Sequence, residues 1–349
     1  MKLTVEKVSK NAESKIATTA TSAEIPAGAI VITTADPQFS TVKSPNPENP
    51  EGFVYAEKLA YDIDASFIIG TDPDCDRVGV MVKNPEGKFI PLTGNQIGSL
   101  LMDFIASQRT KKGTMPKNPI AVKTVVTTPM AEKIANSYGI EMKNVLTGFK
   151  YIGEIIKNLE EVNEEERYVF GFEESYGYLA GTYARDKDAV VASMLIAQMA
   201  AHYMEENKTL FDAMQELYEK YGFFREVQKS ITLEGIDGTQ RIKNFMSHLK
   251  ANPVQEADGK KVVLISDYSI SERINLVSGE TEKINLPKAD VLEYVLEDNR
   301  RFIVRPSGTE PKIKFYMEAK LDLANREDYY AVKDAAMAKI EAIRKDLGI

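Results

Sequence analysis

The chain has 349 residues, more than one ordinary domain holds, and 43% of them are hydrophobic, which is enough to form sizeable buried cores. A net charge of −8 argues against binding to nucleic acid, the single cysteine, Cys75, excludes an intrachain disulfide, and no apolar run reaches the ~18 residues of a membrane span. The first residues also lack the apolar segment of a signal peptide. We therefore expect a cytoplasmic protein that binds neither nucleic acid nor membranes.

The first expected domain covers residues 1–92 and contains an acidic loop between two strands. Repeated prolines up to Pro50 predict a surface loop, because proline fits neither a helix interior nor a strand ladder. Apolar residues at helical spacing predict a helix over 51–62. Two short β-branched stretches, 67–70 and 78–82, predict strands on either side of the acidic loop.

The second expected domain, 93–224, alternates strands with helices. Strands are expected at 120–126, 140–146 and 168–172, and helices at 94–108, 130–138, 151–159 and 188–204. Thr93 is the expected N-cap of the first of these helices. This alternation predicts a parallel or mixed sheet covered by helices, with a functional site in the loops at the strand ends.

The pattern changes in the third expected domain, 225–349. Strands are expected at 227–233, 261–266, 291–296, 301–305 and 312–320, with helices at 239–249 and 326–347. Runs of strands with flanking helices are typical of an α+β domain. The predicted fold class is α/β, with mixed-sheet α/β/α domains and a C-terminal α+β domain.

The acidic loop carries Asp72, Asp74 and Asp76 at alternate positions, followed by Arg77. Carboxylates this close repel one another unless a cation lies between them, and a hard divalent cation prefers oxygen ligands. An EF-hand is excluded, because Arg77 and Lys83 stand where its glycine and glutamate belong. A solvated acidic turn and a phosphatase with an aspartate nucleophile, as in haloacid dehalogenases, are the alternatives.

Three further stretches carry groups suited to a sugar or to an anion. Glu173 and Ser175, two residues apart, can bind neighbouring sugar hydroxyls, although a solvated turn has the same composition. Lys187, placed among carboxylates, can bind phosphate or exchange a proton, and helix capping is the alternative. A strand-to-helix turn adds free backbone N–H groups and a lysine, at Thr147, Gly148 and Lys150.

The last loop, residues 305–312, combines the groups that a phosphate dianion needs. A guanidinium offers two parallel donors, hydroxyls donate, and glycine lets backbone N–H groups approach. The residues concerned are Arg305, Ser307, Gly308, Thr309 and the nearby Lys314. We interpret this loop as a phosphate site.

Together the loops resemble those of the α-D-phosphohexomutase superfamily. Residues 72–77 resemble its metal loop, 173–175 its sugar loop and 305–312 its phosphate loop, and the runs 44–48, 171–178 and 185–188 are similar to bacterial α-phosphoglucomutases. The family's phosphoserine loop, of the Thr-Ala-Ser-His-Asn-Pro type, has no match. The nearest run, Ala20-Thr21-Ser22-Ala23, lacks the histidine and the Asn-Pro pair.

The resemblance implies a role for each part of the chain. Residues 1–92 would be a truncated remnant of the family's second domain, 93–224 its third domain and 225–349 its C-terminal domain. Asp72, Asp74 and Asp76 would bind Mg²⁺, with Arg77 and Lys187 as catalytic groups beside the transferred phosphate. The implied substrate-binding residues are Thr147, Gly148, Lys150, Glu173, Ser175, Arg305, Ser307, Gly308, Thr309 and Lys314.

The implied activity is the interconversion of glucose 1-phosphate and glucose 6-phosphate through glucose 1,6-bisphosphate. Without the phosphoserine loop, we expect the chain alone to be inactive, because the covalent step has no nucleophile. One alternative is a non-catalytic sugar-phosphate-binding module or half of a split enzyme, completed by an N-terminal partner or by self-association. Another, within the same class, is a phosphomannomutase, because both activities need the same hydroxyl contacts.

Overall fold

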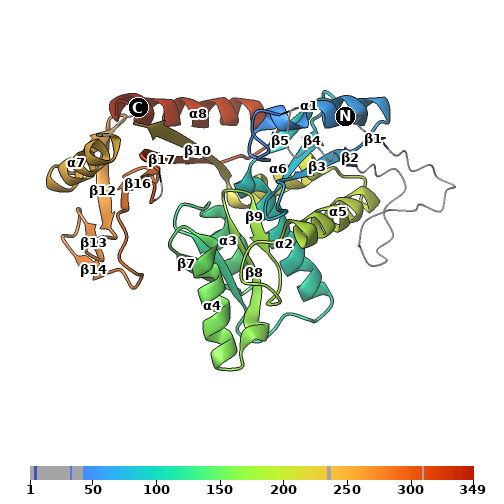
Figure 1. The fold of residues 1–349 in the computed structure, drawn as a ribbon, viewed down its shortest axis with the longest axis horizontal. Coiled ribbons are helices and arrows are strands. Elements are labelled where there is room, and N and C mark those ends of the chain that lie inside the picture. Colours follow the sequence, from blue (N-terminus) through green and yellow to red (C-terminus); the bar gives the residue numbers. More distant parts are fainter. Residues whose placement is uncertain (1–3, 6–31, 34–41, 234–236, 309) are drawn as a thin grey trace.

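The computed structural model describes residues 4–5, 32–33, 42–233, 237–308 and 310–349. In this part of the chain three bodies of sheet and helix follow one another, coloured from blue through green to red in Figure 1. In addition, β1 (Thr4–Val5) and β2 (Ile32–Thr33) form a short antiparallel pair. The helices of the described residues are all too short or too polar to cross a membrane.

The first body is a small antiparallel sheet with one helix. Its elements are η1 (Pro50–Phe53), α1 (Val54–Asp62), β3 (Phe67–Thr71), β4 (Val78–Lys83) and β5 (Phe89–Leu92). The strand order is β3-β4-β5. Phe53 of η1 and Ala60 of α1 pack on the sheet and join a buried cluster with Ile68, Met81 and Phe89. The acidic loop connects β3 to β4, and the pairing of Thr71 with Val78 closes it.

The second body is a mixed sheet with helices around it. Its elements are α2 (Gly94–Lys111), β6 (Ile120–Thr124), α3 (Met130–Ser137), β7 (Glu141–Val145), α4 (Phe149–Glu161), η2 (Glu165–Arg167), β8 (Tyr168–Glu173), β9 (Gly177–Leu179), α5 (Ala189–Glu205) and α6 (Leu210–Tyr221). The order is β7-β6-β8-β9, and only β9 runs antiparallel to its neighbour. Thr93 caps α2 in a capping box with Gln96.

The parallel direction of β6, β7 and β8 decides where the loops of this body lie. Parallel strands end at the same edge of a sheet, so the loops that follow them become neighbours. These loops begin at Thr124, Val145 and Glu173, and they include two of the loops that the sequence singles out.

The third body is an antiparallel sheet with two long helices. Its elements are β10 (Phe223–Thr232), α7 (Gly238–Ala251), β11 (Glu256–Ala257), β12 (Lys260–Asp267), β13 (Glu272–Asn275), β14 (Thr281–Lys283), β15 (Leu292–Leu296), β16 (Arg301–Pro306), β17 (Lys312–Leu321), η3 (Arg326–Asp328) and α8 (Tyr329–Asp346). The order is β10-β17-β16-β15-β12-β13-β14, with β11 paired to β12. The hairpin of β16 and β17 carries the predicted phosphate loop at its tip.

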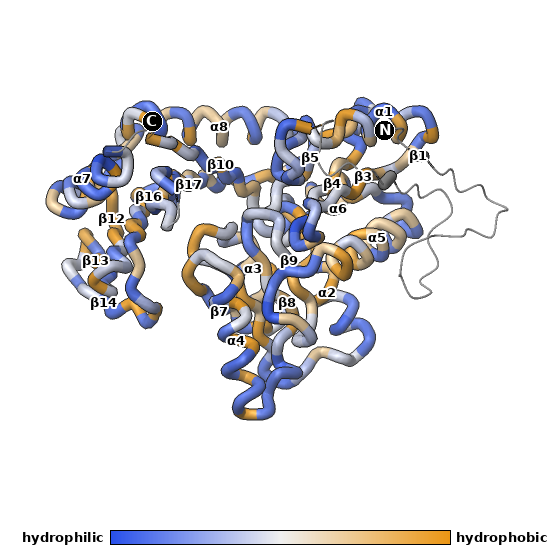
Figure 2. Tube along the Cα trace, viewed as in Figure 1, coloured by the Kyte–Doolittle hydropathy of each residue, from blue (hydrophilic) through white to orange (hydrophobic). Residues whose placement is uncertain are grey.

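One of the buried apolar clusters extends through all three bodies. This cluster includes Val80 of β4, Leu100 of α2, Leu217 of α6 and Phe302 of β16. Figure 2 shows apolar residues along α2 and α5, and these two helices pack on each other. At the start of α8, Tyr330 donates a hydrogen bond of 3.1 Å to Glu86 in the first body. The α/β fold class and the C-terminal α+β domain are confirmed.

The sequence interpretation left out α6 and the short strands β9, β13 and β14. Helix α6 follows α5 after a brief turn and has its own capping box at Thr209. This N-terminal signal was missed because the long apolar helix α5 directly precedes it. The three strands have only three or four residues each. Strands this short carry no readable alternation, and their neighbours in the sheet define them.

Candidate functional site

The acidic loop has the geometry of a cation site. One carboxylate oxygen from each of Asp72, Asp74 and Asp76 lies within 4.8 Å of the others. Asp72 is largely buried and Asp74 is exposed. The turn needs an uncommon conformation at Cys75, whose φ is 57°. The cluster is therefore open to solvent at Asp74 and closed toward the protein at Asp72.

Backbone hydrogen bonds hold this cluster in place. Oδ1 of Asp72 accepts hydrogen bonds from the backbone N–H groups of Asp76, at 3.0 Å, and Arg77, at 2.9 Å. Burial is the main cause that raises the pKa of Asp72, and the charges of Asp76 and Asp74 add to it. A divalent cation would remove this repulsion. Three clustered carboxylates are the hard oxygen ligands that Mg²⁺ prefers, so the residues present fit the ion.

Arg77 connects the acidic loop to the second body. Its backbone forms an isolated antiparallel bridge with Gly177, and the next amide, of Val78, donates to the carbonyl of Tyr176 at 3.1 Å. Its guanidinium lies 3.3 Å from a carboxylate oxygen of Glu48 and 3.7 Å from one of Asp76. The end of the Glu173–Tyr176 loop therefore lies directly beside the acidic loop.

Lys187 reaches the same cluster from the loop before α5. Its Nζ lies 2.8 Å from Asp76 and 3.1 Å from Asp186. Its own burial opposes the charge, but the hydrogen bonds to these carboxylates prevail and raise the pKa of Lys187. Burial likewise opposes the charge of Asp76, and the bond from Lys187 nevertheless lowers the pKa of that carboxyl. Lys187 is thus a protonated cation at the edge of the acidic cluster.

The loops around Glu173 and Gly148 meet at the end of the mixed sheet. Oε1 of Glu173 accepts a hydrogen bond of 2.7 Å from the backbone N–H of Gly148. Gly148 has a φ of 117°, a conformation that side chains disfavour, so a glycine is needed where the N–H turns toward Glu173. Burial raises the pKa of Glu173 despite this bond. Thr147 is half-buried beside Gly148, whereas Lys150 is exposed and its Nζ lies 4.8 Å from the ring centre of Tyr151.

The predicted phosphate residues lie on the β16–β17 hairpin. Arg305 and Lys314 are direct cross-strand partners. The backbone N–H of Ser307 donates to the carbonyl of Lys312 at 2.7 Å, which closes the turn, and Gly308 at the tip is exposed. Thr309 lies outside the described residues, as does the Ala20–Ala23 run. The hairpin therefore presents two cations at the base of an exposed turn.

A cavity of about 250 Å³ lies where the three bodies meet. Its lining includes Glu48 of the first body, Ser175 of the second, and Glu226 and Tyr316 of the third. Burial raises the pKa of Glu226 to about 7, and the neighbouring Glu318 acts in the same direction. The cavity places the predicted sugar-binding Ser175 on a surface shared with the sheet that carries the predicted phosphate loop.

The sequence interpretation missed three polar groups around these loops. Glu48 pairs with Arg77, and the Ser-Pro-Asn-Pro-Glu run that contains it was the available signal. Glu174, between two predicted sugar ligands, turns away from them toward Thr124 and Thr127. Arg301, whose sequence neighbourhood gives no signal, reaches from the third body to the second.

Comparisons with known proteins support one family. Models of the phosphoglucomutase/phosphomannomutase family match three stretches: α/β/α domain II at 24–87, α/β/α domain III at 93–221 and the C-terminal domain at 248–342. The chain is 38% identical over 285 residues to a phosphoglucomutase of Staphylococcus aureus (strain MSSA476). The matched region covers 82% of this chain and 50% of the relative. It therefore spans about half the length of the curated relatives it matches.

Two solved structures share the fold at low identity. The phosphoglucomutase parafusin of Paramecium, in an open form, has a TM-score of 0.55 at 20% identity, covering 86% of this chain and 50% of that one. A family protein of Burkholderia thailandensis has a TM-score of 0.51 at 16% identity, covering 84% and 52%. The matches in sequence and fold agree, and the chain belongs to the phosphoglucomutase/phosphomannomutase family.

Proposed function

We propose that this chain binds hexose phosphates and carries the metal, sugar and phosphate sites of a phosphotransferase that interconverts glucose 1-phosphate and glucose 6-phosphate. The observation that carries the proposal is the bridge between Arg77 and Gly177, which puts the acidic loop beside the Glu173–Tyr176 loop. Two loops far apart in the sequence, with the chemistry of a cation site and of a hydroxyl site, thus become neighbours.

The proposed roles divide a hexose phosphate between its two ends. Glu173 and Ser175 would bind two neighbouring sugar hydroxyls, with Thr147, Gly148 and Lys150 at the sugar edge. The non-reacting phosphate would lie on the hairpin, where Arg305 supplies a planar pair of donors and Lys314 a point charge. The remaining proposed contacts are Ser307, Gly308 and Thr309.

The reacting phosphate would lie at the acidic loop. Asp72, Asp74 and Asp76 would hold Mg²⁺, which neutralises charge on phosphoryl oxygens when it is bound. Arg77, turned toward Glu48 and Asp76, would orient the phosphate from the first body. Lys187, protonated beside Asp76, would face it from the second.

We further propose that the chain alone binds glucose 1,6-bisphosphate without transferring phosphate. The family's phosphoserine motif has no match in the sequence, and without a nucleophile the covalent step itself is absent. A non-catalytic sugar-phosphate-binding module would also bind without turnover. An inactive part of a mutase and such a module therefore behave alike when the chain is alone. They differ only when a partner supplies the serine loop.

Calorimetry tests the proposal directly. The chain, with Mg²⁺ present, is titrated with glucose 1,6-bisphosphate and with glucose 6-phosphate, and a coupled assay measures mutase turnover. We expect saturable binding of both ligands, and turnover no higher than that of a variant carrying both Arg305→Ala and Asp74→Asn.

The matched control for Arg305→Ala is Arg241→Ala, which removes an exposed arginine from α7 of the same body. We expect loss of phosphate-ester binding with Arg305→Ala alone. Absence of binding by the unmodified chain overturns the proposed function, and clear turnover overturns the proposed inactivity. Titration with mannose 6-phosphate separates the two specificities, and equal affinity for both sugars would leave no glucose preference.

A further inference from the structure

The turn that follows β6 is a buried polar junction, which we call the threonine turn and define as Thr124–Thr128. Its three threonines are buried almost completely. Oγ1 of Thr124 lies 2.8 Å from Oγ1 of Thr127, and the backbone N–H of Thr128 donates to Asn95 at 3.1 Å. Buried polar groups persist only when they have partners, so this turn is held in one geometry by its hydrogen bonds.

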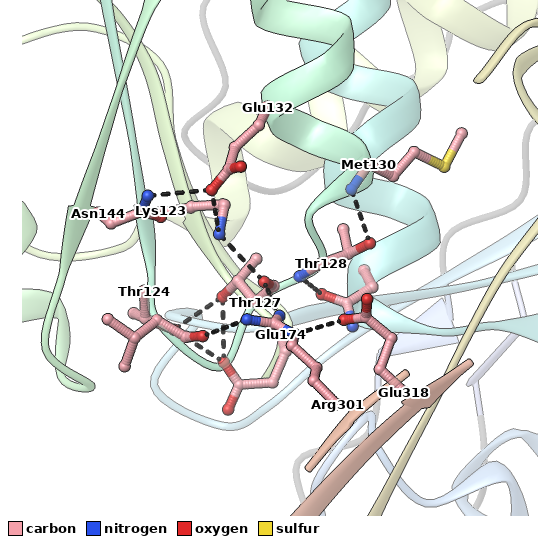
Figure 3. A network of polar contacts seen from close by, with 12 residues as sticks. Lys123, Thr124, Thr127, Thr128, Met130, Glu132, Asn144, Glu174, Arg301 and Glu318 are labelled. Atoms are coloured by element: carbon pink, nitrogen blue, oxygen red, sulfur yellow. Dashed lines mark hydrogen bonds and ion pairs between the residues drawn. The ribbon is translucent and has the colours of Figure 1, made fainter. Parts of the chain in front are cut away.

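The proposed sugar loop, Glu173–Tyr176, is hydrogen-bonded to one side of this turn. Oε2 of Glu174 lies 3.3 Å from Oγ1 of Thr124 and 3.2 Å from Oγ1 of Thr127 (Figure 3). Its neighbour Glu173 points the other way, toward Gly148. The two adjacent carboxylates thus attach the loop to two neighbouring segments at the sheet edge, the threonine turn and the turn at Gly148.

The phosphate-bearing strand is attached to the other side. The guanidinium of Arg301 donates to the carbonyl oxygens of Val125, at 3.2 Å, and Thr127, at 3.1 Å. The same group pairs with Glu318 at 2.9 Å and Glu293 at 3.2 Å (Figure 3 shows Glu318). Planar guanidinium groups that donate in several directions hold two elements at a fixed angle.

A second cation reinforces the turn from within the second body. Nζ of Lys123, whose residue is 1% exposed, donates to the carbonyl of Thr127 at 3.2 Å and pairs with Glu132 at 3.1 Å. The Thr127 carbonyl therefore accepts from Lys123 on its own body and from Arg301 on the next. The turn is anchored to β6 independently of the third body, so it is a fixed point for Arg301 to bind.

We propose that Arg301 and Glu174 are positioning residues that set, through the threonine turn, the distance between the hydroxyl-binding loop and the phosphate hairpin. Arg301 lies on β16 four residues before Arg305, about 13 Å along an extended strand. Glu174 lies directly between Glu173 and Ser175. This inference rests on the proposed function of those residues as ligand contacts.

The inference separates ligands by what they span. A hexose phosphate contacts both the loop and the hairpin, so its affinity depends on their spacing. Inorganic phosphate is too small to contact the loop and the hairpin at once, so its affinity for either phosphate site does not depend on their spacing. Loss of the Arg301 contact must therefore weaken the binding of glucose 6-phosphate selectively.

The test compares Arg301→Met with Arg300→Met by calorimetry, using glucose 6-phosphate and inorganic phosphate. Arg300 is the matched control, because it is a buried arginine next to Arg301 in the sequence. Unlike Arg301, it pairs with Asp258 and Asp298, which belong to its own body. For Arg301→Met we expect about a tenfold or greater loss for glucose 6-phosphate and less than about a twofold change for phosphate. For Arg300→Met we expect no such selectivity.

Glu174→Gln and a ligand-free measurement complete the test. Glu174→Gln keeps an oxygen for the threonine hydroxyls and should fold if Arg301→Met does not, with a smaller selective loss. Hydrogen exchange of the unliganded chain should show faster exchange at residues 174–177 in Arg301→Met than in Arg300→Met. Arg301→Lys should partly restore the slow exchange.

The outcomes are distinguishable. Unchanged exchange at residues 174–177 in both Arg301→Met and Glu174→Gln overturns the inference, whether or not the chain binds a sugar phosphate. Equal losses for both ligands in Arg301→Met also overturn it. Faster exchange in a chain that binds no hexose phosphate overturns the proposed function and leaves the positioning role standing.

Discussion

Two clusters of charged residues, the acidic loop and the network around the threonine turn, differ in how their charges are balanced. In the acidic loop three carboxylates face one another and Asp74 is exposed, although Lys187 and Arg77 lie beside Asp76. Around the threonine turn, Arg301 and Lys123 are enclosed by carboxylates and carbonyl oxygens. Open, mutually repelling charges favour a bound cation, whereas enclosed and paired charges hold elements together.

The largest expected effect tests the enclosed cluster. Arg301→Ala should lower the free energy of unfolding by about 3–5 kcal/mol, because Glu318 would remain buried without its partner and Glu293 would be left with the longer ion pair to Arg273. Urea denaturation measures the loss. Lys157→Ala, which breaks the exposed pair with Glu161, should cost less than about 1 kcal/mol. Similar losses in both variants would remove the distinction between the two kinds of charge.

The second effect tests the open cluster. Asp74→Asn should weaken Mg²⁺ binding about tenfold or more while leaving the free energy of unfolding within about 0.5 kcal/mol of its original value, because the side chain is exposed. Calorimetric titration with Mg²⁺ and urea denaturation provide the two numbers. Asp62→Asn, at the end of α1, is the control. Unchanged affinity would favour the solvated acidic turn.

A third effect concerns pH. Burial raises the pKa of Glu174 to about 7, above the ~4.5 of an unfolded chain. The folded state therefore holds the proton that the unfolded state releases, and this contribution to stability is full below about pH 4.5 and is lost as the pH rises through about 7. From pH 5 to pH 8 the stability of Glu174→Gln should rise relative to the unmodified chain by about 2–3 kcal/mol, as measured by urea denaturation.

The opposite sign, or a difference independent of pH, would mean that Glu174 stays ionised in the folded state. The Glu174 carboxylate would then resemble the open charges of the acidic loop rather than the enclosed charges around the threonine turn. Glu226, whose pKa burial also raises to about 7, is present in both chains and cancels from the comparison.

The smallest effect concerns the backbone at Gly148. Gly148→Ala should destabilise the chain by about 1 kcal/mol, because φ is 117° there although no atom crowds the added methyl group. It should also weaken hexose-phosphate binding by moving the N–H that Glu173 accepts. Gly52→Ala, in open space without a positive φ, should change neither quantity. Thermal unfolding and calorimetry measure both.

Local sequence determined the parts of this protein whose information lies within a few residues. Helix α2 follows from its apolar spacing and its Thr93–Gln96 capping box, and the acidic loop follows from three aspartates within five residues. Regular alternation of strands and helices determined the fold class for the same reason, since each element carries its own hydrophobic period. Helix α6 had these signals too and was overlooked beside the longer α5.

Only the tertiary structure decided which of these pieces meet. Glu48 and Arg77 are 29 residues apart, and Arg301 and Thr127 are 174 apart, so no local pattern relates them. The parallel strands bring the loops after β6 and β8 to one edge, and packing then turns Glu174 toward the threonines and Glu173 toward Gly148. Burial, which depends on every neighbouring element, alone decided that one charged cluster is open and the other enclosed.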